Sequence, residues 1–166
     1  MSFKSKNSYE KKTLPWLWLS ILIIVLDQWT KYLIVHHLVF GWPIKIFPWL
    51  NLTLNYNTGA AFSFLATETG WQIYFFALMA LIVSVFLIIW LIRIQYSDHW
   101  KAISLALVLG GVLGNFIDRV RLGYVIDFID FHIKDWHYAT FNIGDNAICV
   151  GVFLLIIVTI FRRQSS

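Results

Sequence analysis

The stretch WQIYFFALMALIVSVFLIIWLI, residues 71–92, decides the fold class of this chain. It contains no charged residue and is long enough for an α-helix to cross about 30 Å of hydrocarbon, which takes about 20 apolar residues. Three other stretches, residues 15–35, 102–117 and 147–161, are nearly as apolar, although the last two are short or glycine-rich. The sequence therefore predicts four transmembrane helices.

The overall composition agrees with an integral membrane protein. Of 166 residues, 59% are hydrophobic and only 13% are charged, and the mean hydropathy is +0.70, which is too apolar for a soluble domain of this length. Basic residues cluster near the amino terminus, at Arg93 and Lys101, and at residues 162–163. This pattern indicates that both termini face the cytoplasm. It does not indicate nucleic-acid binding, and we expect no nucleic-acid partner.

The two outer connections, residues 36–70 and 118–146, carry a different pattern. In LNLTLNYN, residues 50–57, apolar and polar residues alternate with the period of a half-buried strand. Residues 124–131 and 138–141 are also rich in β-branched and aromatic side chains. We therefore expect one membrane domain over residues 1–166, mostly α-helical, with a small β-sheet at its outer face. Amphipathic rings at the headgroups would be Trp42, Trp49, Trp136 and Tyr138.

Asp127 and Asp145 are the strongest candidates for chemistry, because a carboxylate near hydrocarbon is costly and is by default a functional hypothesis. Two carboxyl groups close together share one proton, so that one acts as base and the other as acid. Such a pair can activate water against a peptide bond and protonate the departing amine. Asp130 and Asp135 compete in the same connection. The spacing of His132 and His137 matches no zinc pattern, and we expect no metal or cofactor.

Other polar residues near the helix ends are candidates for a supporting role. Asp27 and Lys31 lie four residues apart in DQWTK and predict an ion pair at the interface, structural in purpose, with the lysine stem snorkelling. Arg119 is expected to support the outer loop or its neighbour Asp118 by charge-assisted hydrogen bonds. Cys149 is expected to be buried packing. Close helix packing is predicted at three glycines, Gly110, Gly111 and Gly114.

Five strings in order, DQWTK, NYNTGAAF, GGVLGNFIDR, VIDFIDF and FNIGDNAI, closely resemble the lipoprotein signal peptidases, the type II signal peptidases of bacterial inner membranes. The similarity runs from about residue 14 to residue 161. It implies an aspartic endopeptidase without a cofactor, which removes the signal peptide of prolipoproteins just before a diacylglyceryl-modified cysteine. The partners it implies are that lipid-modified substrate and membrane lipid, and we expect a monomer.

The resemblance also implies roles for particular residues. The family's catalytic pair falls on Asp127 and Asp145, in VIDF and FNIGD. Asp27 and Lys31 match the charged residues of DQWTK. The remaining matches line or support the site, and they are Asn57, Gly59, Asn115, Asp118, Arg119 and Asn142. One departure is Gly144, where the family usually has alanine; the loss of a methyl group removes no functional group.

Three other classes of protein remain open on the sequence. A transporter or proton-coupled channel also carries intramembrane acids, but it would normally place them at mid-span, and the middles of the second and fourth spans have none. A structural membrane subunit would not need two acids beside asparagines. An intramembrane aspartyl protease of the G-x-G-D kind would need a glycine that NIGD lacks.

Overall fold

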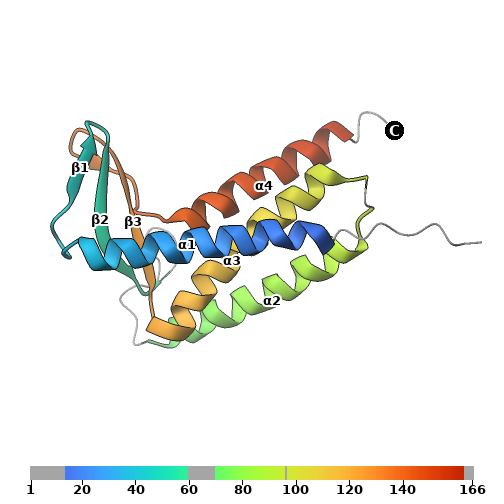
Figure 1. Ribbon diagram of the computed structural model, residues 1–166, viewed down its shortest axis with the longest axis horizontal. Helices are drawn as coiled ribbons and strands as arrows, with labels where there is room; N and C mark the ends of the chain where they lie inside the picture. Colours follow the sequence, from blue (N-terminus) through green and yellow to red (C-terminus); the bar gives the residue numbers. More distant parts are fainter. Residues whose placement is uncertain (1–13, 60–69, 96, 163–166) are drawn as a thin grey trace, which may run out of the picture.

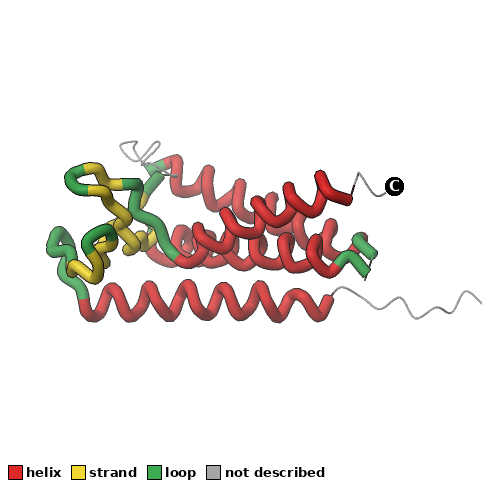
Figure 2. Tube along the Cα trace, turned by 90° about the horizontal axis from the view of Figure 1, so that it is seen from above, coloured by secondary structure: helices red, strands yellow, loops and turns green. Residues whose placement is uncertain are grey.

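Four long helices and a small sheet make up the part of the chain that the computed structural model describes, residues 14–59, 70–95 and 97–162. After a short 3-10 turn, η1 (Leu14–Trp16), the helices are α1 (Leu17–His37), α2 (Trp71–Arg93), α3 (His99–Leu122) and α4 (Ile143–Arg162). All four are long and apolar enough to cross a membrane. They run alongside one another as a bundle, with the strands gathered at one end (Figures 1 and 2). The prediction of four transmembrane helices and a small sheet is confirmed.

The third and fourth helices are longer than predicted. Residues 102–117 were expected for the third span and 147–161 for the fourth, but α3 continues to Leu122 and α4 begins at Ile143. Polar residues at these ends lower the hydropathy without ending the helix. Asp118, for example, follows the predicted span, is almost completely buried inside the protein and accepts a hydrogen bond there from Gln28. A prediction from apolar residues alone ends the span at such polar residues, although the helix continues.

The sheet is antiparallel with the order β1-β2-β3-β4, made of β1 (Ile44–Phe47), β2 (Leu50–Asn57), β3 (Val125–Ile133) and β4 (Trp136–His137). The predictions for β2 and β3 are confirmed within a few residues, whereas β1 was not predicted. The strand expected over residues 138–141 is wrong. The chain turns back at Lys134, in the left-handed region with φ of 54°, so pairing resumes at once in β4, and only Phe141 forms a further bridge, to Ile129.

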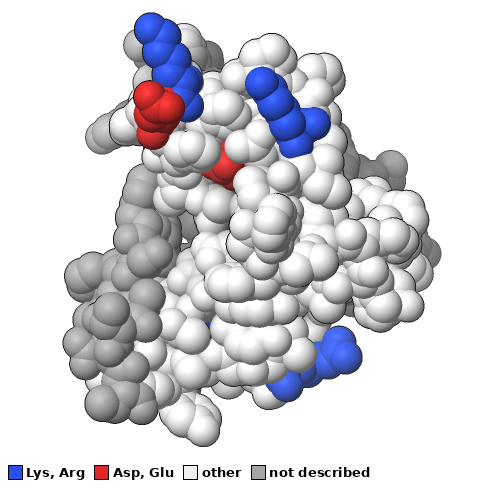
Figure 3. Space-filling model, turned by 90° about the vertical axis from the view of Figure 1, so that its left-hand side faces the viewer, with Lys and Arg blue, Asp and Glu red and all other residues white. Residues whose placement is uncertain are grey.

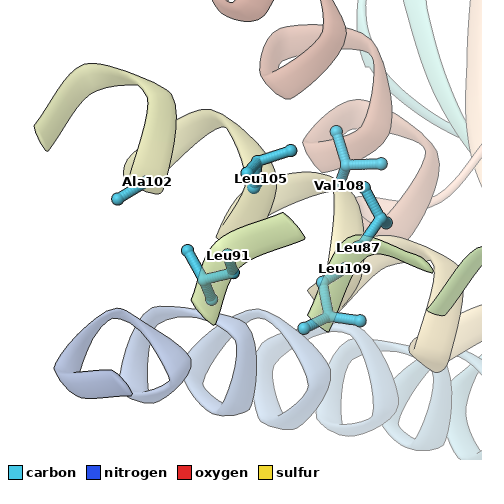
Figure 4. Close-up of a cluster of buried hydrophobic side chains, with 6 residues drawn as sticks. All are labelled: Leu87, Leu91, Ala102, Leu105, Val108 and Leu109. Atoms are coloured by element: carbon cyan, nitrogen blue, oxygen red, sulfur yellow. The ribbon is translucent and has the colours of Figure 1, made fainter. Parts of the chain in front are cut away.

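Helix α3 is the central element of the bundle. Its residues Ala102, Leu105, Val108 and Leu109 form the largest buried apolar cluster together with two leucines of α2, Leu87 and Leu91 (Figure 4). A second cluster joins α1 to the sheet and consists of Ile34, Leu54, Ile126 and Phe128. The sheet is thus held against the end of the bundle by apolar contacts, which fixes the position of β3 relative to the helices.

Glycines let α3 approach its neighbours closely, as predicted. A Cβ atom on Gly111 would collide with the carbonyl oxygen of Gly144 in α4 and would lie 2.8 Å from Cγ1 of Ile148. A Cβ atom on Gly110 would lie 2.7 Å from Cβ of Ile23 in α1. Gly111 of α3 therefore meets α4 on both sides of Asp145: at Gly144, directly before it, and at Ile148, three residues after it.

Candidate active site

Asp127 is the third residue of β3, near the junction of the sheet and the bundle. It pairs with Asn55 of β2, and Asn57 lies two residues further along the same strand, opposite Val125. This diagonal neighbour reaches the carboxyl group: Asn57 Nδ2 donates to Asp127 Oδ2 at 3.0 Å. Asn142 Nδ2 donates to Asp127 Oδ1 at 2.7 Å. Each oxygen of a nearly buried carboxyl group, 2% exposed, thus accepts a hydrogen bond from an amide.

Asp145 lies in the first turn of α4 and is held by residues on two sides. Asn115 of α3 donates from Nδ2 to Asp145 Oδ1 at 2.8 Å, and the backbone N–H of Asn142 donates to Asp145 Oδ2 at 3.2 Å. In return the N–H of Asp145 donates to Asn142 Oδ1 at 2.9 Å. This reciprocal pair has the form of a helix cap, so the residue that caps α4 also binds Asp127.

Both acids line one cavity of about 500 Å3. Polar groups occupy part of its wall, among them Asn57, Asn115 and Arg119, while Val125, Phe141 and Ile148 provide apolar surface. The end of the molecule that carries the sheet shows mostly uncharged surface, with an acidic spot recessed below its neighbours (Figure 3). A partly apolar cavity with a few convergent polar groups is the usual form of a binding site.

The pKa of Asp127 is well above the ordinary value for an aspartate. Burial, and after it the nearby charge of Asp145, raise the pKa of this carboxyl from 3.8 to about 7. Hydrogen bonds from Asn57 and Asn142 and the charge of Lys31 act against this rise. A carboxyl group with such a pKa can hold or release a proton near neutral pH, as general acid–base catalysis requires.

Of the two roles predicted for Arg119, support of the outer loop or of Asp118, the contacts agree with the first. Asp118 Oδ2 lies 2.8 Å from Nζ of Lys31, and Asp118 Oδ1 accepts a hydrogen bond from Gln28 at 2.7 Å. Arg119 instead donates from Nη2 to the carbonyl oxygen of Gly59 at 2.9 Å. Neighbouring residues on a helix point in different directions, so Asp118 faces α1 while Arg119 lies at the cavity. The contact of Arg119 with Gly59 joins α3 to the outer connection.

The ion pair of Asp27 and Lys31 is present, and both side chains are buried inside the protein. Lys31 Nζ lies 2.7 Å from Asp27 Oδ2, and the two side chains are 2% and 0% exposed. The lysine therefore does not snorkel to the membrane surface, because its acceptors are inside the bundle. Asp27 also reaches α4, since its Oδ1 accepts a hydrogen bond from the N–H of Gly144 at 2.8 Å.

Gly59 ends the described part of the first connection with a tight turn. Its N–H donates to Asn57 Oδ1 at 3.0 Å, a local side-chain to backbone bond typical of asparagine turns. The bond leaves Nδ2 of Asn57 directed at Asp127.

The competing acids have other surroundings. Asp130 accepts hydrogen bonds from Asn51 at 2.9 Å and from His137 Nδ1 at 2.8 Å, and Asp135 lies in the exposed turn before β4. The rings of His132 and His137 stack 5.0 Å apart. Among the described residues, no group of three or more His, Cys, Asp or Glu side chains could hold a metal ion.

The prediction that Cys149 is buried is wrong. Two residues with contacts near the site, Gln28 and Thr140, were not among the predicted site residues. Cys149 is exposed and lines the cavity; it lies one helical turn after Asp145, so the spacing of four residues could have placed it there. Gln28 donates to Asp118 and to the carbonyl oxygen of Gly114 at 3.2 Å, and it stands next to Asp27 in the motif. Thr140 accepts a bond from Asn55 at 2.8 Å and lines the cavity, which no local pattern indicated.

Four helices able to span a membrane, with two carboxyl groups lining one cavity beside the sheet, define a multi-pass membrane protein with a candidate acid–base site. Residues 19–161 match the family model described as signal peptidase (SPase) II. The chain belongs to this family, and it is therefore a membrane-bound protease.

Similar proteins agree with the family. A protein of Coxiella burnetii named lipoprotein signal peptidase is 63% identical over 93% of this chain and 95% of its own length. One of Acinetobacter baumannii with the same name is 49% identical over 91% and 86%. A solved structure described as a bacterial membrane enzyme has a TM-score of 0.82 at 32% identity, covering 92% of this chain and 91% of that chain. A second has a TM-score of 0.79 at 33% identity, covering 90% and 96%. The resemblance stated from the sequence motifs is confirmed.

Proposed function

We propose that this chain is an aspartic endopeptidase of the bacterial inner membrane that removes the signal peptide from diacylglyceryl-modified prolipoproteins and cuts before the lipidated cysteine. The observation that carries the proposal is the pair of acids, Asp127 and Asp145, lining one cavity in a member of a protease family. Each is fixed by amide donors, and the pKa of Asp127 is about 7.

The reaction needs one proton on the pair at the start. The ionised carboxylate, assigned to Asp145, takes a proton from a water molecule whose oxygen attacks the peptide carbonyl carbon. Asp127, holding the shared proton, gives it to the departing amine as the C–N bond breaks. One proton has then entered the pair and one has left, so the pair again carries a single proton after each cleavage.

Arg119 and Asn57 are proposed to bind the peptide beside the acids. Both line the cavity. Nε of Arg119 is buried and has no hydrogen-bond partner among the described residues, which suits a donor that a substrate carbonyl would satisfy. Asn142 is less suitable as the oxyanion donor, because its Nδ2 already faces Asp127 Oδ1, Asn115 Oδ1 and the carbonyl oxygen of Ile126.

A site at the end of the bundle suits a lipid-modified substrate. With both termini in the cytoplasm, the sheet and the cavity lie at the periplasmic face, where the acyl chains can enter laterally past the exposed side of α4. Cys149 of α4 is exposed and also lines the cavity, so the cavity and the outer surface of the bundle are continuous there. Water would reach the acids from the periplasm. Because both acids belong to one chain, we propose that the protein works as a monomer.

Cleavage of a diacylglyceryl-modified precursor by the purified protein, followed by gel shift, tests the proposal. D127N and D145N should each abolish conversion while inserting normally, because either change removes an essential proton donor or acceptor. D135N is the matched control, since Asp135 lies in an exposed turn, and it should cleave at the parent rate. Conversion should persist with a chelator. Processing by D127N and D145N at the parent rate would exclude the carboxylate pair, and a lack of conversion by the parent protein would exclude the substrate.

A further inference from the structure

Lys31 is the one described cation that lies at the centre of the network behind the acids. It is 2% exposed, and its Nζ lies 2.7 Å from Asp27 Oδ2, 2.8 Å from Asp118 Oδ2 and 2.9 Å from Asn115 Oδ1. An ammonium group has three N–H donors and no acceptor. All three donors are therefore used inside the protein, two on carboxylates and one on an amide.

The contact with Asn115 determines which way its amide points. Oδ1 of Asn115 accepts from Lys31 and also from Asn142 Nδ2 at 3.1 Å, which leaves its Nδ2 to donate to Asp145. Rotating the amide by half a turn would direct its NH2 group at the ammonium group and its oxygen at a carboxyl oxygen. Both contacts would be repulsive in a buried site, so Lys31 selects the orientation in which Asn115 donates to Asp145.

The same orientation extends to the second acid. Because Oδ1 of Asn115 faces Asn142, it accepts from the amide group that also donates to Asp127 at 2.7 Å. We propose that Lys31 is a positioning residue for both acids, acting through Asn115 on Asp145 and through Asn115 and Asn142 on Asp127. This inference rests on the proposed carboxylate pair. It assigns to the buried lysine an effect on the reaction in addition to the ion pair it forms.

Lys31 also acts on Asp127 through its charge, in addition to the hydrogen bonds that run through Asn115 and Asn142. It lowers the pKa of Asp127, whose other charged neighbours are Asp145 of α4 and Arg119 of α3. Lys31 itself faces the charges of Asp27 and Asp118 and lines a small cavity with His36 and Arg121. Removing the lysine should therefore let the pKa of Asp127 rise, whereas a lysine with only a structural role would leave the pH profile of cleavage unchanged.

K31M tests the assignment through the kinetics of the full-length protein on the lipidated precursor. It removes the ammonium group and keeps an apolar stem of similar length. We expect kcat to fall about 10- to 100-fold, the loss typical of residues that orient metal ligands in the same indirect way, with KM little changed, and the alkaline limb of the kcat profile to move to higher pH. K101M is the matched control, because Lys101 pairs with Asp98 at the other end of α3 at 3.8 Å, and it should keep both values.

A second variant protects the test against loss of folding. K31M/D118N removes one positive and one negative charge, so the buried net charge is unchanged, and it should show the same fall in kcat. If D127N and D145N abolish cleavage but a folded K31M or K31M/D118N protein keeps the parent kcat and pH profile, the carboxylate pair stands and the inference is wrong. If neither lysine variant folds, Lys31 is structural and the assignment is likewise wrong.

Discussion

At the residue scale, the site is built at the expense of stability. Asp127 occupies a strand position whose neighbours Ile126 and Phe128 are 5% exposed, and it is itself 2% exposed. A pKa of about 7 instead of 3.8 corresponds to about 4 kcal/mol of preference for the protonated form in the folded protein. The folded state therefore binds this proton more tightly than the unfolded state does.

The raised pKa of Asp127 makes the stability of the folded protein decrease as the pH rises. The stability that Asp127 contributes is fully present below its unfolded pKa of about 4 and is lost as the pH rises through about 7. D127N removes this titration, so the difference in melting temperature between D127N and the parent protein should increase between pH 5 and pH 8. Intrinsic tryptophan fluorescence during heating measures it. D135N, at an exposed position, should show no such trend, and a difference for D127N that is flat with pH would contradict the raised pKa.

At the element scale, the sequence predicted what depends on periodicity and missed what depends on long-range contacts. The alternation in β2 was predictive because one side of the strand packs on the core. Strand β1 is exposed at all four positions, so no alternation marks it. The pairing of Asp118 with Lys31 joins two helices that are far apart in the sequence, and local reasoning assigned Asp118 to its neighbour Arg119. The candidate acids themselves were found because carboxylates stand out in an apolar chain.

The packing of α3 on α4 is the element contact on which the site most depends. G111A should destabilise the protein, because the new methyl group would collide with the backbone oxygen of Gly144, and a backbone carbonyl cannot rotate away as a side chain can. Overpacking of this kind typically costs about 1–3 kcal/mol. It should also reduce cleavage, since Gly144 immediately precedes Asp145. Melting temperature and gel-shift rate measure the two effects.

V85L is the control for that experiment. Val85 is 49% exposed on α2, so an added methylene group there meets no packed backbone, and both values should stay at those of the parent protein. A G111A protein with the parent melting temperature would show that α3 and α4 can separate without loss, and the close approach of their backbones would then not be what positions Asp145.

At the scale of the whole molecule, four spanning helices place the start of α1 and the end of α4 on the same side of the membrane. The beginning of α1 and the end of α4 lie at one end of the bundle, and the sheet lies at the other (Figure 1). Arg93, Lys101 and the residues near both termini supply the positive charge, which favours the cytoplasmic side for that end. With the proposed orientation, the cavity lies on the opposite side, where the proposed lipid-modified substrate would arrive.

Labelling single cysteines with a membrane-impermeant maleimide tests this orientation. Cys149 is the only cysteine in the chain, so C149S provides the background. D135C lies in the exposed turn of the sheet and S97C in the exposed connection between α2 and α3. In cells whose outer membrane is permeabilised, D135C should react at once and S97C only after lysis, because the inner membrane then stands between reagent and thiol. The reverse pattern would place the sheet in the cytoplasm. It would separate the carboxylate pair from any substrate held in the outer leaflet, even if the pair itself were intact.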